Sequence, residues 1–248
     1  MLQFSKKTVL ITGASEGIGR ATAKEFASQG ANLILVARNF QRLKELSEEL
    51  SKFDVKIQIE ALDLSNTKAI DDFFSQISEL DIAINNAGVE GPTKQIHDFE
   101  LNNFDEVFNV NVRALFQCLK HEVYFFRKNK KPGSIVNISS IAGSKGIAYS
   151  SLYVASKHAV LGFTRAVAVE QIKHGIRVNC VSPGATDTAM LRRIMGPRVD
   201  DFIAGQPNGK FATPESIAAT ISWLCRSESE NIVGQDIIID GGKTVNLA

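Results

Sequence analysis

The stretch TGASEGIG, residues 12–19, joins an apolar run to the first helical pattern of the chain. The run before it, KTVLIT at 7–12, is typical of a buried strand, and residues 17–29 are typical of a helix ended by Gly30. A diphosphate reaches the backbone N–H groups at a helix N-terminus only where side chains are absent. Glycines 13, 17 and 19 at this strand–helix junction therefore predict a phosphate site.

Strand and helix patterns alternate along the rest of the chain. The expected strands are 7–12, 32–37, 56–62, one within 81–88 that runs into a loop, 133–140, 176–183 and 235–242. The expected helices are 17–29, 40–52, 66–79, an irregular 101–128, 151–173 and 214–226. Gly175 suits the cap after 151–173, while Thr213 and Pro214 suit the start of the last helix.

Repeated strand–helix–strand units with apolar strands indicate an α/β protein. We expect a doubly wound Rossmann fold with a seven-stranded parallel sheet and helices on both faces. No repeat or linker divides the 248 residues, so the whole of 1–248 is predicted to be one dinucleotide-binding and catalytic domain. Residues 184–212 are rich in glycine and proline, which predicts a substrate-binding loop.

Composition excludes several classes of function. With 44% hydrophobic and 22% charged residues the chain is not disordered, and a net charge of +1 gives no reason to expect nucleic acid as partner. No apolar run approaches the ~20 residues that span a bilayer, and no leader pattern precedes the first strand. The three cysteines are far apart, without metal-ligand spacing. We expect a cytoplasmic protein with neither metal nor membrane partner.

The end of the second expected strand bears on which dinucleotide binds. An acid there accepts hydrogen bonds from an adenosine ribose, whereas an arginine suits a 2′-phosphate. The sequence has Arg38 and no acid at this point, so NADP(H) is predicted over NAD(H), with Arg38 on the phosphate. A solvated loop arginine is the alternative, and NAD(H) stays possible. Glu16 in the glycine loop opposes a bound phosphate.

The stretch YVASK, residues 153–157, places a tyrosine and a lysine on one face of an expected helix. A nearby ammonium group favours a phenolate, so we expect Lys157 to lower the pKa of Tyr153. Such a tyrosine could exchange a proton with a substrate oxygen. The plain alternative is two amphipathic side chains on the wet edge of a helix.

Six motifs occur together in order: TGASEGIG, NNAG at 85–88, the asparagine of VNV at 110–112, NISS at 137–140, YVASK and PGATDT at 183–188. Over essentially the whole chain they resemble the short-chain dehydrogenase/reductase family. The resemblance implies that Tyr153 is the proton donor or acceptor, that Lys157 lowers its pKa and binds ribose, and that Ser140 binds the substrate oxygen. It implies that Asn111 holds a water of the proton relay. We choose Ser140 over Ser139 because neighbours on a strand point to opposite sides.

The same resemblance implies a set of cofactor contacts. Asp63 matches a residue at the adenine amino group, Thr188 one at the nicotinamide carboxamide, and the loop 85–88 lies beside the adenine ribose. The full expected set is Gly13, Ser15, Gly17, Ile18, Gly19, Arg38, Asp63, Leu64, Asn85, Ala87, Gly88, Tyr153, Lys157, Pro183, Gly184, Thr186 and Thr188.

The expected activity is hydride transfer between NADP(H) and a carbonyl or secondary alcohol of a small, moderately hydrophobic substrate. The expected substrate contacts are Ser140, Tyr149, Tyr153, Met190 and Leu191. Arg192 and Arg193 beside them leave open a carboxylate or an acyl carrier, so a 3-oxoacyl-thioester (acyl carrier protein) reductase is the alternative. A non-catalytic NADP(H)-binding regulator is a further one.

Oligomerisation is implied by the resemblance alone. Family members commonly form tetramers through the helices that carry Asn111 and Tyr153 and through the last strand, so we expect a homotetramer. Apolar positions that fit such contacts, or simply the core, are Val160, Phe163, Val167 and Ile237.

Overall fold

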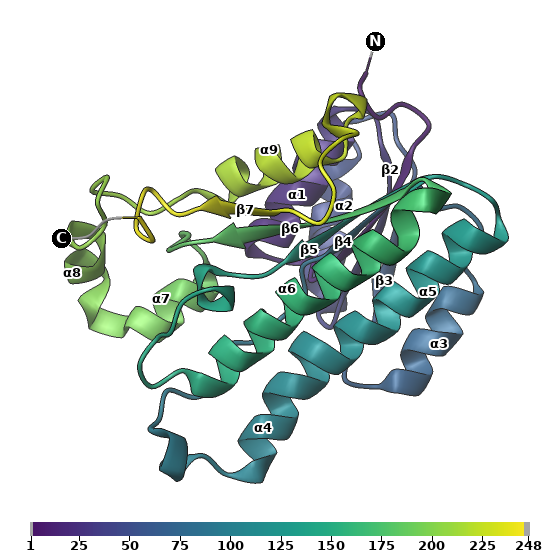
Figure 1. Cartoon of the computed structure of the whole chain (residues 1–248). Helices are drawn as coiled ribbons and strands as arrows, with labels where there is room; N and C mark the ends of the chain where they lie inside the picture. Colours follow the sequence, from purple (N-terminus) through teal and green to yellow (C-terminus); the bar gives the residue numbers. More distant parts are fainter. Residues whose placement is uncertain (1, 246–248) are drawn as a thin grey trace.

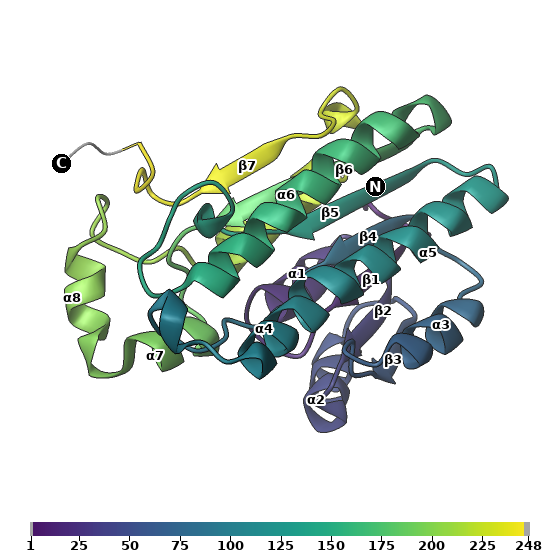
Figure 2. The ribbon, with the colours of Figure 1, turned by 60° about the horizontal axis from the view of Figure 1, so that its bottom comes forward.

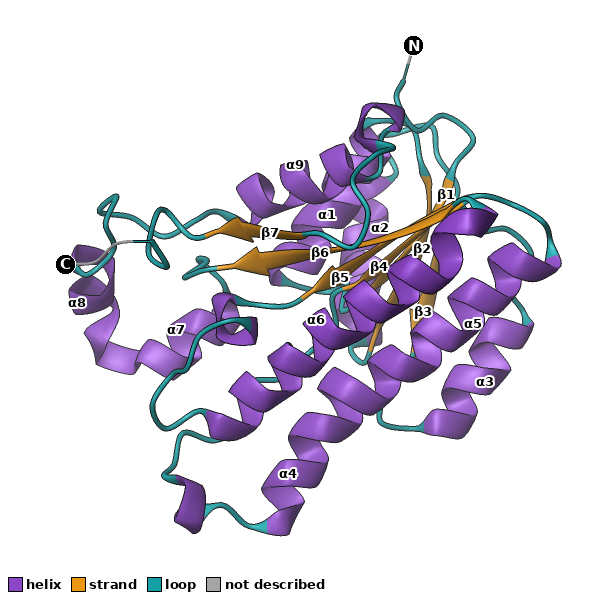
Figure 3. Cartoon of the chain, in the orientation of Figure 1, coloured by secondary structure: helices purple, strands orange, loops and turns teal. Residues whose placement is uncertain are grey.

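The computed structural model describes residues 2–245, and its centre is one parallel sheet in the order β3-β2-β1-β4-β5-β6-β7 (Figures 1 and 3). The strands are β1 (Thr8–Thr12), β2 (Asn32–Ala37), β3 (Ile57–Ala61), β4 (Ile82–Asn85), β5 (Gly133–Ile138), β6 (Ile176–Pro183) and β7 (Asp236–Ile239). All the pairings are parallel. The predicted seven-stranded parallel sheet is confirmed.

Helices cover both faces of the sheet, as Figures 1 and 2 show. One layer contains α1 (Gly17–Ser28), α2 (Phe40–Leu50) and α9 (Pro214–Leu224). The other contains α3 (Thr67–Ser75), α5 (Leu115–Lys128), which continues α4 (Leu101–Phe108), and α6 (Ser151–Gln171). Each layer has its own apolar cluster against the sheet. Strands buried on both faces explain the nearly continuous apolar runs of the sequence.

The strand order reverses between β1 and β4. From β1 the chain builds outward to β2 and β3, and from β4 it builds the other way to β7. β1 and β4 are neighbours, with Ile11 opposite Ile84, so the loops after these strands start side by side. Ligands of open α/β sheets bind in the crevice at such a reversal. The glycine loop lies at this point.

The structure departs from the sequence prediction in two long segments. The predicted helix 101–128 is divided by a π-helical turn, Asn109–Ala114. Such turns occur mostly as single insertions at functional sites, and this one contains Asn111. The predicted loop 184–212 contains two short helices, α7 (Ala189–Met195) and α8 (Val199–Ala204). They extend beyond the carboxyl ends of β6 and β7 (Figure 1).

Local signals for helix ends were correct. Thr213 caps α9 by accepting a hydrogen bond from the Ser216 N–H, with Pro214 as the first helical residue. Gly175 follows the short turn after α6 with a φ of 74°, a left-handed conformation that favours glycine.

Candidate active site

A large cavity of about 940 Å³ lies at the carboxyl ends of the central strands. Most of the predicted site residues line it. They are Gly13, Ser15, Gly17, Ile18, Arg38, Asp63, Leu64, Ala87, Gly88, Ser140, Tyr153, Lys157, Pro183, Gly184, Thr186, Thr188, Met190 and Leu191. Its volume is within the upper range of small-molecule and cofactor pockets. Four predicted residues lie outside its walls and are described below.

The glycine loop is closed tightly upon itself. A Cβ on Gly19 would lie 2.2 Å from the Gly13 carbonyl oxygen, so Gly19 is needed for packing rather than as a cavity wall. Gly17 has a φ of 54° and faces Thr188 across the cavity. Glu16, the N-cap of α1, makes no side-chain capping bond, and the first turn has no acidic residue. The first N–H groups of α1 are therefore suited to an anion.

The carboxylate of Glu16, which argued against a phosphate in the sequence, is engaged elsewhere. It forms an ion pair with Arg42 on α2. Arg38 is exposed where β2 ends and lines the cavity. The Ser65 N–H donates to Asp63, 2.9 Å away, and lowers the pKa of that carboxyl, with a smaller contribution from the charge of Arg38.

The two asparagines of NNAG differ in role. Asn85, predicted to lie beside the ribose, is buried instead and donates to Glu122 at 3.0 Å and Asn137 at 3.1 Å. It does not line the large cavity, which corrects that prediction. Asn86, which was not predicted, does line it and donates to the carbonyl oxygens of Thr12 and Gly13. It thereby ties the glycine loop to the end of β4.

Asn111 lies behind the cavity wall. Its side chain accepts from the Val89 N–H at 2.8 Å and donates to the Val89 carbonyl at 2.9 Å and to Ser156 Oγ at 3.0 Å. These bonds fix the π-helical turn against both the loop after β4 and α6. Asn111 and Lys157 also border a second, small cavity of about 10 Å³, close to the space one water needs.

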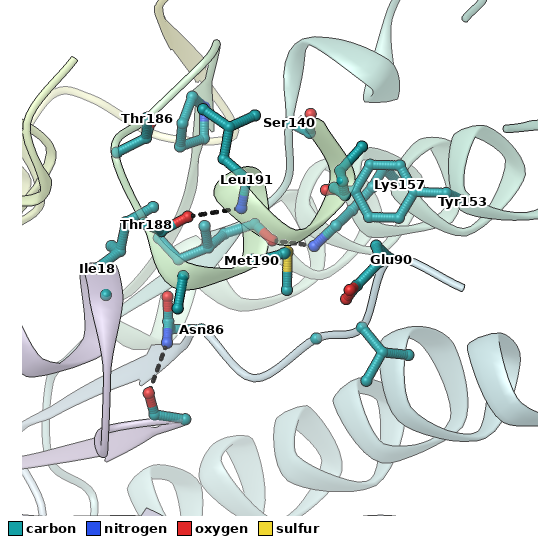
Figure 4. A pocket seen from close by; sticks show the side chains of 18 of the residues that line it. Ile18, Asn86, Glu90, Ser140, Tyr153, Lys157, Thr186, Thr188, Met190 and Leu191 are labelled. Atoms are coloured by element: carbon teal, nitrogen blue, oxygen red, sulfur yellow. Dashed lines mark hydrogen bonds between the residues drawn. The ribbon is translucent and has the colours of Figure 1, made fainter. Parts of the chain in front are cut away.

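Tyr153, Ser140 and Lys157 meet at the inner end of the cavity (Figure 4). Lys157 is buried and its Nζ donates to the Ile138 carbonyl oxygen at 2.9 Å, lying 5.7 Å from the centre of the Tyr153 ring. Ser140 lines the cavity beside Tyr153, and its Oγ accepts from the Ala142 N–H at 3.2 Å. Ser139 points the other way and donates to the Lys157 carbonyl at 3.0 Å.

The electrostatics of this group differ from the expectation. Although Tyr153 as a residue is partly exposed, desolvation of its phenol raises the pKa of Tyr153; the nearby Ser140 side chain opposes this, and the charge of Glu90 adds to it. Burial lowers the pKa of Lys157 to about 8. The prediction that Lys157 lowers the pKa of Tyr153 is therefore wrong for this structure. The ammonium group is directed to the Ile138 carbonyl instead of the phenol.

The end of the cavity that was predicted to bind substrate is formed largely by α7. Thr188 caps this helix by accepting from the Leu191 N–H at 3.2 Å, and Met190 and Leu191 line the cavity (Figure 4). Tyr149 does not: it is 59% exposed, with a φ of 64°, and lies outside the walls, so its predicted substrate contact is corrected. Ile147 and Phe202, not predicted, do line the cavity.

Both arginines of α7 are paired with carboxylates. Arg192 makes a two-pronged contact with Asp187 at 2.7 and 2.9 Å. Arg193 Nε lies 2.8 Å from Glu90, a residue of the loop after β4. No local sequence pattern indicates this role of Glu90, because the pair joins positions 103 residues apart.

Within residues 2–245, no group of three histidine, cysteine, aspartate or glutamate side chains is arranged to hold a metal ion. None of the helices described is both long and apolar enough to cross a membrane.

Comparison with known proteins agrees with this geometry. A family model described as enoyl-(acyl carrier protein) reductase matches residues 13–244. The 3beta-hydroxysteroid dehydrogenase of Mediterraneibacter gnavus is 35% identical over 98% of this chain and 97% of its own. Dehydrogenase/reductase SDR family member 6 of Rattus norvegicus is 37% identical over 98% and 99%.

Comparison with solved structures also finds reductases. Levodione reductase superimposes with a TM-score of 0.93 at 31% identity, over 98% of this chain and 99% of its own. ElxO with NADP bound superimposes with a TM-score of 0.88 at 31% identity, over 97% and 100%. The chain is an enzyme of the short-chain dehydrogenase/reductase family.

Proposed function

We propose that this enzyme transfers hydride between NADP(H) and the carbonyl or secondary alcohol of a small, moderately hydrophobic substrate. The observation that carries the proposal is the meeting of Tyr153, Ser140 and Lys157 in the same cavity as the glycine loop and Arg38. A proton donor and a hydrogen-bonding clamp then lie at one end, and phosphate-binding groups at the other.

The residues present fit the cofactor. The uncapped first turn of α1 and Gly17 would hold the diphosphate, and Arg38 would hold the 2′-phosphate. Thr186 and Thr188 would contact the nicotinamide end. When bound, NADPH supplies the hydride. That the similar ElxO was solved with NADP bound supports this choice over NAD(H).

Tyr153 is proposed as the acid and base at the substrate oxygen. Because its pKa is raised, the phenol keeps its proton at neutral pH and is ready to give it, which favours carbonyl reduction. Ser140 would hold the same oxygen. Lys157 and Asn111, which share the small second cavity, would return a proton to the phenol through a water.

The cofactor assignment is tested by measuring binding of NADPH and NADH to the purified protein. NADPH should bind more tightly, and Arg38→Asp should abolish or reverse the preference because it places a carboxylate where the 2′-phosphate would lie. Lys68→Asp, an equal charge change at an exposed position on α3, should leave the preference intact. Equal affinities in the unaltered protein would refute the role of Arg38.

A 3-oxoacyl-thioester reductase is the second candidate, supported by the 33% identity of this chain to a 3-oxoacyl-[acyl-carrier-protein] reductase of Rickettsia bellii. The pairing of Arg192 with Asp187 and of Arg193 with Glu90 weakens it, since both are the arginines that an acidic carrier would need. Following NADPH absorbance with cyclic ketones and with acetoacetyl thioesters separates the two. Tight NADPH binding without oxidation by any carbonyl tried would favour a regulator.

We further propose a cytoplasmic homotetramer. Exposed apolar side chains on α4, α5 and α6 support subunit contacts there: Leu101 is 86%, Tyr124 63% and Val169 78% exposed. Val160 gives no such support, because it is buried in the core. The cysteines are free thiols, which suits a reducing compartment. Light scattering tests the assembly.

A further inference from the structure

Glu90 is fixed in place by its neighbours. The backbone of Val89 is held on both its N–H and its carbonyl by Asn111. Gly91 has a φ of 68°, and a Cβ there would lie 2.5 Å from Val107 Cγ2. The chain on either side of Glu90 therefore has little freedom, and the direction of its side chain is set by the fold.

That side chain faces the substrate end of the cavity. Glu90 is a wall residue with 21% of its side chain exposed, and its charge acts on Tyr153. Figure 4 shows Glu90 beside Tyr153 and Met190. A carboxylate thus stands close to where a carbonyl group would react.

The cations around this carboxylate are already occupied or distant. Arg193 is paired with Glu90 itself. Lys157 donates to the Ile138 carbonyl, and Lys243 donates to the Gly205 carbonyl at 2.8 Å. Lys145 is at the exposed rim, where solvent and salt screen its charge. A substrate carboxylate entering this end would meet the carboxylate of Glu90 and would have to compete with it for Arg193.

We propose that Glu90 is a specificity-determining residue whose carboxylate selects uncharged carbonyl substrates over carboxylate-bearing substrates of the same shape. The inference rests on the proposed function and narrows its substrate class. Apposed like charges disfavour the wrong ligand, and a fixed charge in a partly desolvated wall discriminates more strongly than one in water. Apolar contacts from Met190 and Leu191 would bind the ketone skeleton in either case.

The test uses two ketones of nearly equal shape, methyl 4-oxocyclohexanecarboxylate and 4-oxocyclohexanecarboxylate, with NADPH. The unaltered enzyme should have the higher kcat/KM for the ester. Glu90→Gln should raise kcat/KM for the acid relative to the ester by about tenfold, because it removes the opposing charge and frees Arg193. Asp187→Asn is the matched control: it frees Arg192 on the same helix, outside the cavity wall, and should leave the ratio unchanged.

Arg193→Gln provides a second variant that does not depend on the folding of Glu90→Gln. It leaves the Glu90 charge without its partner, so the ratio of kcat/KM for the acid to kcat/KM for the ester should fall further. If the enzyme reduces the ester but neither variant changes this ratio of kcat/KM values, the inference is overturned and the proposed function stays intact. Absence of NADPH oxidation with both ketones would overturn both.

Discussion

Glu122 is a carboxyl group enclosed in the core, and its removal gives a stability prediction with a definite pH dependence. Its side chain on α5 has no exposed surface. Oε2 accepts one hydrogen bond from Asn85 at 3.0 Å, and Oε1 has no partner among the residues described. Burial raises the pKa of Glu122 from 4.5 to about 8, against the smaller opposing effect of the Asn85 bond.

The sign of this pH dependence follows from the number of protons bound by the folded and the unfolded protein. In the unfolded chain the carboxyl loses its proton near pH 4.5, whereas in the folded protein it keeps the proton until about pH 8. Between these values the folded state binds more protons, so the free energy of unfolding falls as pH rises, by about 1.4 kcal/mol per pH unit. The accumulated loss is about 1 kcal/mol at pH 5 and roughly 3 kcal/mol at pH 7.

Glu122→Gln has nearly the shape of the protonated acid, keeps an acceptor for Asn85 and cannot ionise. It should therefore raise the melting temperature, and the gain should be larger at pH 7 than at pH 5 by roughly 4–8 °C, since about 2 kcal/mol separates the two conditions. Thermal melts of parent and variant at both pH values measure this. Because all other groups titrate alike in both proteins, they cancel in the difference.

Glu106→Gln on α4 is the matched control, since the Glu106 side chain is exposed to solvent. Its effect on melting should be small at both. A gain for Glu122→Gln that is the same at pH 5 and pH 7 would refute the reasoning, because the cost would then have no connection with ionisation.

Three further outcomes are expected. Gly19→Ala should lower both the melting temperature and the affinity for NADPH, because its Cβ would lie 2.2 Å from the Gly13 carbonyl oxygen; an unchanged melting curve would contradict this. Ser140→Ala should reduce kcat for ketone reduction by roughly 10²-fold or more while the Kd of NADPH stays constant, and a loss confined to cofactor binding would count against the proposed role. The kcat/KM for NADPH should be level at neutral pH and fall above about pH 8, where Lys157 loses its charge, so a profile still level at pH 9 would exclude that dependence.

The fold could be predicted because its signals are local. Apolar strands and a glycine loop between β1 and α1 depend on short segments, and the parallel sheet follows from their alternation. Asn85 and Asn86 mark the limit of such signals. Which of two adjacent side chains enters the cavity depends on where β4 ends. The segment 81–88 was predicted as a strand running into a loop, without the residue at which the strand stops, and it stops at Asn85. Tyr149 was misplaced for a similar reason, since its left-handed backbone redirects the chain.

Charge interactions were harder to predict than positions, and Tyr153 illustrates why. The spacing of Tyr153 and Lys157 correctly predicted two side chains on one helical face, but it gives no direction for the ammonium group. The Ile138 carbonyl on β5 and Glu90 after β4, both remote in sequence, determine the outcome together with burial. The phenol is thereby kept protonated and the lysine is brought close to losing its charge. A site in this state is prepared to give a proton, and this is the physical reason to test it first as a reductase.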